Sequence, residues 1–114
     1  ADLTSKKQEE SSSTIRVRVN KARRRQQARF AGTGIYSNSG MTPVQIRKYC
    51  PLAPEVQDVL KLAFDSLGLS ARAHDRILKV ARTIADLNGD EDITVDHIGE
   101  AIQYRSLDRK FWGA

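Results

Sequence analysis

Two neighbouring stretches of this sequence, residues 54–67 and 70–88, each place apolar side chains along one face of an α-helix. In the first stretch the apolar positions are 3, 1, 3, 1 and 3 residues apart, and they are Val56, Val59, Leu60, Ala63, Phe64 and Leu67. Pro54 suits the first helical position, and Gly68 suits the residue that follows the last turn. This stretch is therefore the firmest helix prediction in the chain.

The second stretch has an arginine unusually close to its start. Ser70 is a capping residue, Asn88-Gly89 ends the helix, and its apolar face comprises Ala73, Ile77, Val80, Ala81, Ile84 and Leu87. A helix N-terminus carries the positive end of the backbone dipole, so Arg72 lies against the local field. This arginine is either a tolerated surface charge or a group placed to bind an anion.

Two shorter helices are predicted on either side of this pair. Thr42 and Pro43 supply a cap and a first helical residue for a helix at about 43–50. Thr94 caps a helix at about 95–104, which carries Val95, Ile98, Ala101 and Ile102.

The segment before these helices is ambiguous. Ile15, Val17 and Val19 alternate with arginines as in a β-strand, whereas the residues that follow favour a helix. Helical spacing of three or four connects Ile15, Val19, Ala22, Gln26 and Phe30, so we predict a basic helix at about 13–31. Its cap is expected at Ser12 or Ser13, and the Gly-, Ser- and Asn-rich residues that follow it are expected to form a loop.

No stretch after residue 20 has convincing strand character, so the sequence predicts an all-α fold, a small four- to five-helix bundle. We expect residues 1–12 to be a flexible linker and residues 13–114 to form one helical domain. The tail 105–114 contains Leu107, Phe111 and Trp112, which are expected to pack back or to meet a neighbour. Since position 1 is not methionine, the chain is expected to be a piece of a longer protein.

The composition indicates a soluble cytoplasmic domain. No apolar run approaches the ~20 residues that cross a bilayer, and no secretory segment is present, so no membrane partner is expected. The single cysteine, Cys50, can form no internal disulfide, which fits a reducing compartment. We expect it to be a small buried hydrophobe.

The positive charge is concentrated at one end of the chain. Residues 1–31 hold nine Lys and Arg against three Asp and Glu, whereas residues 32–114 hold ten against eleven. A nucleic acid or the acidic surface of another domain fits this asymmetry, although a solvated helix face is the simpler explanation. The residues concerned are Arg16, Arg18, Lys21, Arg23, Arg24, Arg25 and Arg29. No aromatic side chain interrupts them, so binding to nucleic acid would be electrostatic and independent of sequence.

The sequence contains no pattern that supports catalysis by this chain alone. The phosphate-loop pattern GxxxxGK[ST], the GxSxG pattern and clustered Cys/His ligands are all absent, so no catalytic residue and no metal site are predicted. Asp86, Asn88 and Asp90 resemble the start of a calcium loop, but Glu91 and His97 stand where glycine and an acid are needed. We expect His97, and likewise His74, to be a packed or capping histidine.

At the start of the 70–88 helix, Arg72, Arg76 and Lys79 fall within one polar sector. Asp75 lies close to them, and Arg82 is expected to continue the polar face one turn further on. Guanidinium groups in this position can bind phosphate bidentately, and the exposed backbone N–H groups add to the attraction. A routine solvated face remains the alternative.

The segment GLSARAHDRILKVARTIADLNGDEDITVDHIGEAIQYRSLD, with ESSSTIRVRVNKARRRQQARF upstream, resembles the C-terminal part of the magnesium-chelatase-like AAA+ ATPases of bacteria, the ComM-like proteins. The similarity covers residues 9–109 or so, and SARA…R.LKVARTIADL is its most specific portion. In this family a small helical lid follows an ATPase core, and this chain looks like the lid alone.

The resemblance implies a role for the arginine near the helix start. AAA+ lids carry a "sensor 2" arginine that reaches the γ-phosphate of ATP, and the Ser-Ala-Arg motif matches Arg72, with Arg76 a weaker second candidate. The implied cofactors are ATP and Mg²⁺, bound only when the core is present. The implied partners are the ATPase core, neighbouring subunits of a ring and DNA, because the family is associated with DNA uptake and branch migration. The arginine acts either in its own subunit or on a neighbour's nucleotide.

Overall fold

The computed structural model describes the backbone of residues 11–112 and the side chains of residues 11–104. Within this range it contains α-helices and one 3₁₀-helix but no strand, so the all-α prediction is confirmed. The elements are α2 (Ser12–Arg29), the 3₁₀-helix η1 (Asn38–Gly40), α3 (Pro43–Tyr49), α4 (Pro54–Leu67), α5 (Ala71–Asn88) and α6 (Val95–Trp112). Most of the expected linker, residues 1–12, lies outside the described part.

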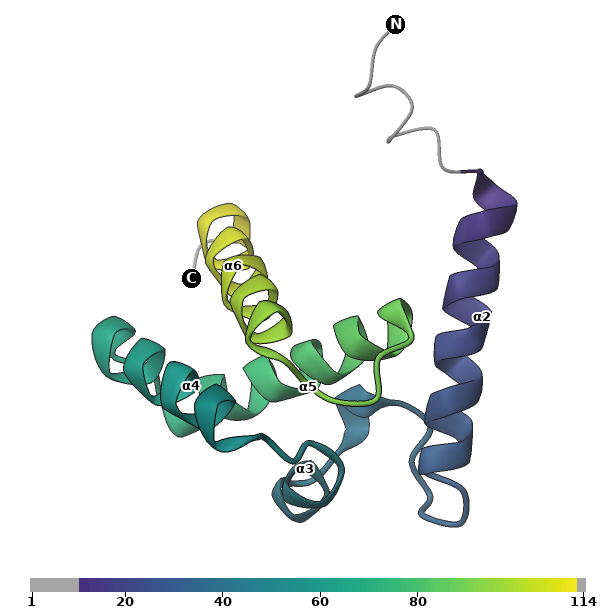
Figure 1. Cartoon of the computed structure of the whole chain (residues 1–114), viewed down its shortest axis with the longest axis horizontal. Helices are drawn as coiled ribbons and strands as arrows, with labels where there is room; N and C mark the ends of the chain where they lie inside the picture. Colours follow the sequence, from purple (N-terminus) through teal and green to yellow (C-terminus); the bar gives the residue numbers. More distant parts are fainter. Residues whose placement is uncertain (1–10, 113–114) are drawn as a thin grey trace, which may run out of the picture.

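Helix α5 runs through the middle of the domain (Figure 1). It packs against α2, η1, α3 and α6, and α4 packs against α6. Helix α2 stands across the C-terminal end of α5, and its first turns stand apart from the other helices (Figure 1). None of the described helices is both long enough and apolar enough to cross a membrane.

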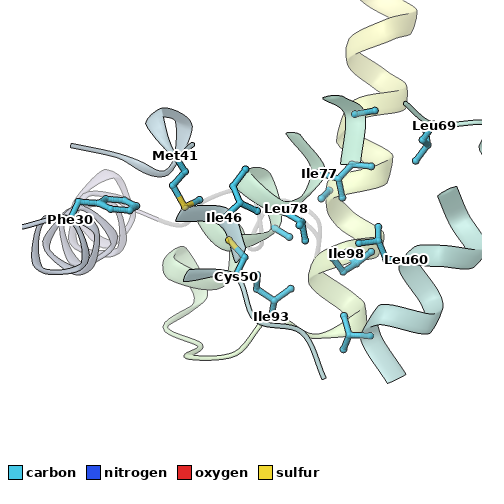
Figure 2. Packing of buried hydrophobic residues seen from close by; sticks show 14 residues of the cluster. Phe30, Met41, Ile46, Cys50, Leu60, Leu69, Ile77, Leu78, Ile93 and Ile98 are labelled. Atoms are coloured by element: carbon cyan, nitrogen blue, oxygen red, sulfur yellow. The ribbon is translucent and has the colours of Figure 1, made fainter. Parts of the chain in front are cut away.

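The hydrophobic core joins α3, α4, α5 and α6 (Figure 2). Ile77 and Ala81 of α5 and Ile98 of α6 are almost completely buried at its centre. Cys50 belongs to the same cluster, as expected for a small buried hydrophobe. Burial raises the pKa of this thiol to about 11.

Most helix ends follow the sequence signals. Thr42 and Gln45 form a reciprocal capping box at the start of α3. The Ser70 hydroxyl accepts a hydrogen bond from the Ala73 backbone N–H at 3.2 Å. Gly68 and Gly89 end α4 and α5 with φ values of +62° and +79°, which side chains rarely tolerate.

The boundaries of α2 and α6 differ from the sequence expectation. The cap of α2 is Ser11, not Ser12 or Ser13, because the Ser11 hydroxyl accepts a hydrogen bond from the Thr14 N–H at 3.1 Å. Helix α6 continues to Trp112 and does not end near residue 104, since no glycine or proline interrupts residues 105–112. The side chains of Leu107, Phe111 and Trp112 lie outside the described range, so their packing stays a prediction.

The apolar stripe expected along α2 is packed only in its C-terminal half. Ala22, Gln26 and Phe30 are buried, whereas Ile15 is 43% exposed. Helix α5 meets α2 from about Arg18 onward, so the first turns lie beyond the end of α5 and are exposed (Figure 1).

Candidate functional site

The three cations near the start of α5 differ in their exposure to solvent. Arg72 and Arg76 are exposed, one turn apart, on the side away from the core. Lys79 is half-buried, and its Nζ donates a hydrogen bond to the Ser39 carbonyl oxygen at 3.1 Å. The predicted sector of three cations therefore reduces to an exposed pair, with Lys79 holding η1 against α5.

Arg82 does not continue the polar face, contrary to the sequence expectation. Its residue is only 4% exposed, and its guanidinium donates to the backbone oxygens of Asp90 at 3.1 Å and Glu91 at 2.9 Å. Burial lowers the pKa of Arg82, while the charge of Asp86, 3.6 Å away, opposes this effect. Arg82 thus holds the turn after α5 in place, and because it is buried it is not part of the candidate surface.

Arg29 is also engaged inside the domain. Its guanidinium forms two hydrogen bonds with the carboxylate of Asp86, at 2.7 and 2.8 Å. The Asn38 side-chain amide donates to the same carboxylate at 2.9 Å, and Arg82 completes what we call the Asp86 cluster: Arg29, Asn38, Arg82 and Asp86. Burial alone would raise the pKa of Asp86, but the hydrogen bonds from Arg29 and Asn38 and the two positive charges lower it. This cluster joins the C-terminal half of α2 to the end of α5.

The burial of Asp86 is not predicted from the sequence, in which this residue is considered only as the first position of a rejected calcium loop. Asp86 is 1% exposed and lies inside the domain. The available signal was the spacing of four residues between Arg82 and Asp86, which predicts that an acid and a base share one side of a helix. No local pattern reveals Arg29, since it lies 57 residues away in the sequence.

The remaining cations of α2 lie on the surface. These are Arg16, Arg18, Lys21, Arg23, Arg24 and Arg25, all of which are exposed. Arg25 also donates a hydrogen bond to the backbone oxygen of Asp86 at 3.3 Å, at the C-terminal end of α5. No acidic residue interrupts α2, so its exposed sides remain basic over the whole helix.

The two histidines have structural roles, as expected. His97 Nδ1 accepts a hydrogen bond from the Thr94 N–H at 2.9 Å, and its Nε2 lies 2.9 Å from the Asp90 carboxylate. The His74 ring lies edge-on to Phe64, with centroids 5.9 Å apart. No group of three or more His, Cys, Asp or Glu residues in the described part of the chain is arranged to hold a metal ion.

A groove that the sequence did not predict lies between α3, α4 and α5. Its volume is about 680 Å³, and its floor includes Ile46, Leu60 and Leu78. Arg47 and Lys61 line it as well, together with His74 and Asp75 from the first turns of α5. The groove therefore begins next to the turn that carries Arg72.

Comparison with known proteins identifies the family. Residues 9–105 match the family described as magnesium chelatase, subunit ChlI C-terminal. The chain belongs to this family. The match includes the whole of α2 and of α5, so both candidate surfaces lie within the ChlI C-terminal domain.

Three relatives of this ChlI C-terminal domain come from different bacteria. Over 100 residues, it is 43% identical to the uncharacterised protein YifB of Escherichia coli K12 and 41% identical to the competence protein ComM of Haemophilus influenzae. It is 34% identical over 97 residues to an uncharacterised protein of Mycobacterium tuberculosis H37Rv. The matches cover 84–88% of this chain but only 19% of each relative. It is a magnesium-chelatase-like C-terminal domain related to ComM, and it spans about a fifth of the relatives' length.

Proposed function

We propose that this domain is the helical lid of a ComM-like AAA+ ATPase and that Arg72 senses the nucleotide. One observation carries the proposal: Arg72 is exposed in the first turn of α5, while the opposite side of that helix is fixed in the core. The guanidinium therefore faces away from the domain, as contact with a phosphate on another domain requires. Arg76, one turn further on, is the second candidate.

The local chemistry suits a phosphate oxygen. An arginine binds phosphate through parallel N–H groups, and a helix N-terminus adds further N–H donors and the positive end of its dipole. The ATP phosphates and Mg²⁺ would be held by the preceding ATPase core, because the phosphate-loop pattern is absent from this sequence. This domain supplies no catalytic residue and no metal ligand under this proposal.

Arg72 would convert the state of the nucleotide into movement. A contact with the γ-phosphate exists before hydrolysis and is lost afterwards, so the lid prefers different positions with ATP and with ADP. Neighbouring subunits of a ring are the further partners, and Arg72 acts on the nucleotide of its own subunit or of the next one. The name of the Haemophilus relative, a competence protein, supports DNA as the substrate of the complete ATPase.

The test substitutes Arg72 in a protein that includes the core. We expect Arg72→Ala to slow ATP hydrolysis at least about tenfold, equivalent to ~1.4 kcal/mol of transition-state stabilisation. The matched control is Arg47→Ala, which removes an exposed arginine from α3, outside both candidate surfaces. Thermal unfolding should be unchanged in both variants. Wild-type turnover in Arg72→Ala would refute the assignment.

A second candidate function, binding of nucleic acid through α2, is favoured by the exposure of six cations on a helix without acids. Such binding neutralises backbone phosphates and weakens steeply with salt. Titrating the chain with single- and double-stranded DNA at two salt concentrations tests it. Tight binding with a steep dependence on salt would support this function, and the absence of binding at low salt would refute it.

A further inference from the structure

A basic pocket lies where α2 meets the C-terminal turn of α5. It has a volume of about 390 Å³. Its lining residues are Arg18, Lys21, Arg25, Asp86, Leu87, Asn88 and Gly89. The three cations follow one another at spacings of three and four residues, so they form a row along one side of α2.

The only acid in this lining is already neutralised. Asp86 is 1% exposed, and its carboxylate accepts hydrogen bonds from Arg29 and Asn38. The other charged side chains that line the pocket are the cations Arg18, Lys21 and Arg25. Opposite this row, the exposed Asn88 carries an amide of the kind that donates to phosphates in protein–DNA contacts.

The position of Arg25 is fixed before any ligand arrives. Its Nη1 donates to the Asp86 backbone oxygen at 3.3 Å, and a guanidinium keeps further N–H donors beyond that bond. A Cβ atom at Gly89 would lie 3.4 Å from Nη2 of Arg25, an ordinary van der Waals distance, so the guanidinium lies directly against this glycine. The pocket is thus partly organised in the free protein.

The dimensions of the row match one strand of nucleic acid. Seven residues separate Arg18 from Arg25, which is about 10.5 Å along the helix axis. Successive phosphates of one strand advance by about 3.4 Å along the axis of B-DNA, so a row parallel to that axis would extend over about three such steps. The adjoining cavity is lined by Asp90, Glu91 and Asp92 and disfavours phosphates, which confines the strand to the side of α2.

We propose that this pocket, defined by Arg18, Lys21, Arg25 and Asn88, is a binding site for the phosphate backbone of nucleic acid. The proposal rests on the second candidate function and narrows it, because it places the contact on one side of α2. Arg16 and Arg23 are seven residues apart and lie on the other side of the helix, away from the pocket. Diffuse attraction to α2 would use both sides equally.

The experiment compares two double variants that lose the same charge. Arg18→Gln with Lys21→Gln removes two of the three cations that line the pocket, and Arg16→Gln with Arg23→Gln is the control on the other side of the helix. We expect the pocket variant to bind a labelled DNA duplex at least tenfold more weakly at low salt. It should also lower the slope of log affinity against log salt by about 1.8, that is about 0.9 per contact. The control should lose less than threefold in affinity.

Each other outcome rejects the site. Equal losses in the two variants would show diffuse attraction, and a larger loss in the control would place the contact elsewhere, while nucleic-acid binding itself would stand. If the wild-type chain did not bind DNA at low salt, the second candidate function would be refuted as well. Loss of binding to phosphatidylserine vesicles, but not to DNA, would assign the pocket to membrane surfaces. A charge-retaining variant, Arg18→Lys with Lys21→Arg, should bind DNA within threefold of wild type, and a tenfold loss would contradict an electrostatic contact.

Discussion

Replacing Asp86 with asparagine removes a negative charge from the joint between α2 and α5 with little change of shape. The carboxylate is 1% exposed and receives two hydrogen bonds from Arg29 and one from Asn38. Arg82 lies 3.6 Å away. In Asp86→Asn, two arginines would remain close together with no anion between them, so we expect a large loss of stability.

The magnitude follows from the burial of the partners. Breaking a buried ion pair by removing one partner costs about 3–5 kcal/mol, whereas an exposed pair contributes about 0–1 kcal/mol. The side chain of Arg82 is 5% exposed, but that of Arg29 is 15% exposed and can turn toward water. The expected loss is therefore near the lower limit, about 3 kcal/mol, out of a total of about 5–15 kcal/mol for a domain.

Urea denaturation, followed by circular dichroism, measures this loss. The matched control is Asp58→Asn, an exposed acid on α4, which should change the free energy of unfolding by less than about 0.5 kcal/mol. A loss below about 1 kcal/mol in Asp86→Asn would refute a stabilising role for the cluster.

We also expect the loss of stability in Asp86→Asn to depend on pH. Because the pKa of Asp86 is lowered in the folded state, its contribution is complete above the unfolded value of about 3.9 and is lost as the pH falls through the folded value. The difference in stability between wild type and Asp86→Asn should therefore shrink in acid below that pH. A difference that stays constant down to the acid transition would contradict the lowered pKa.

Two further predictions concern the residues at the two ends of α3, Thr42 and Cys50. Cys50 is 4% exposed and its pKa is raised to about 11, so a thiol reagent at neutral pH should label it far more slowly in the folded chain than in urea. Equal labelling rates would show that the thiol is accessible. Thr42→Ala removes a capping box and should lower the free energy of unfolding by about 1 kcal/mol, as measured by urea denaturation. Thr42→Ser, which keeps the capping hydroxyl, gives the comparison, and an equal loss of stability there would exclude capping as the cause.

The sequence predicts helices well where the signal is local. The apolar stripe of α4 and the glycine at its end depend only on neighbouring residues, and the helix was found where expected. The same reasoning failed for Arg82, because its burial depends on the carbonyl oxygens of Asp90 and Glu91 in the turn beyond the helix. It failed for Arg29 because an ion pair across 57 residues leaves no trace in a periodic pattern.

Helix α5 connects the two candidate surfaces. Arg72 lies in its first turn and Asp86 in its last, about 21 Å apart at 1.5 Å per residue. At the far end, the Asp86 cluster and the bond from Arg25 join α5 to α2, and Arg25 itself lines the basic pocket. A packed helix transmits displacement as a rigid element. Under the proposed function, a shift of α5 with the state of the nucleotide at Arg72 therefore carries the basic pocket with it. The same cluster that stabilises the fold would then couple nucleotide sensing to the phosphate-binding surface.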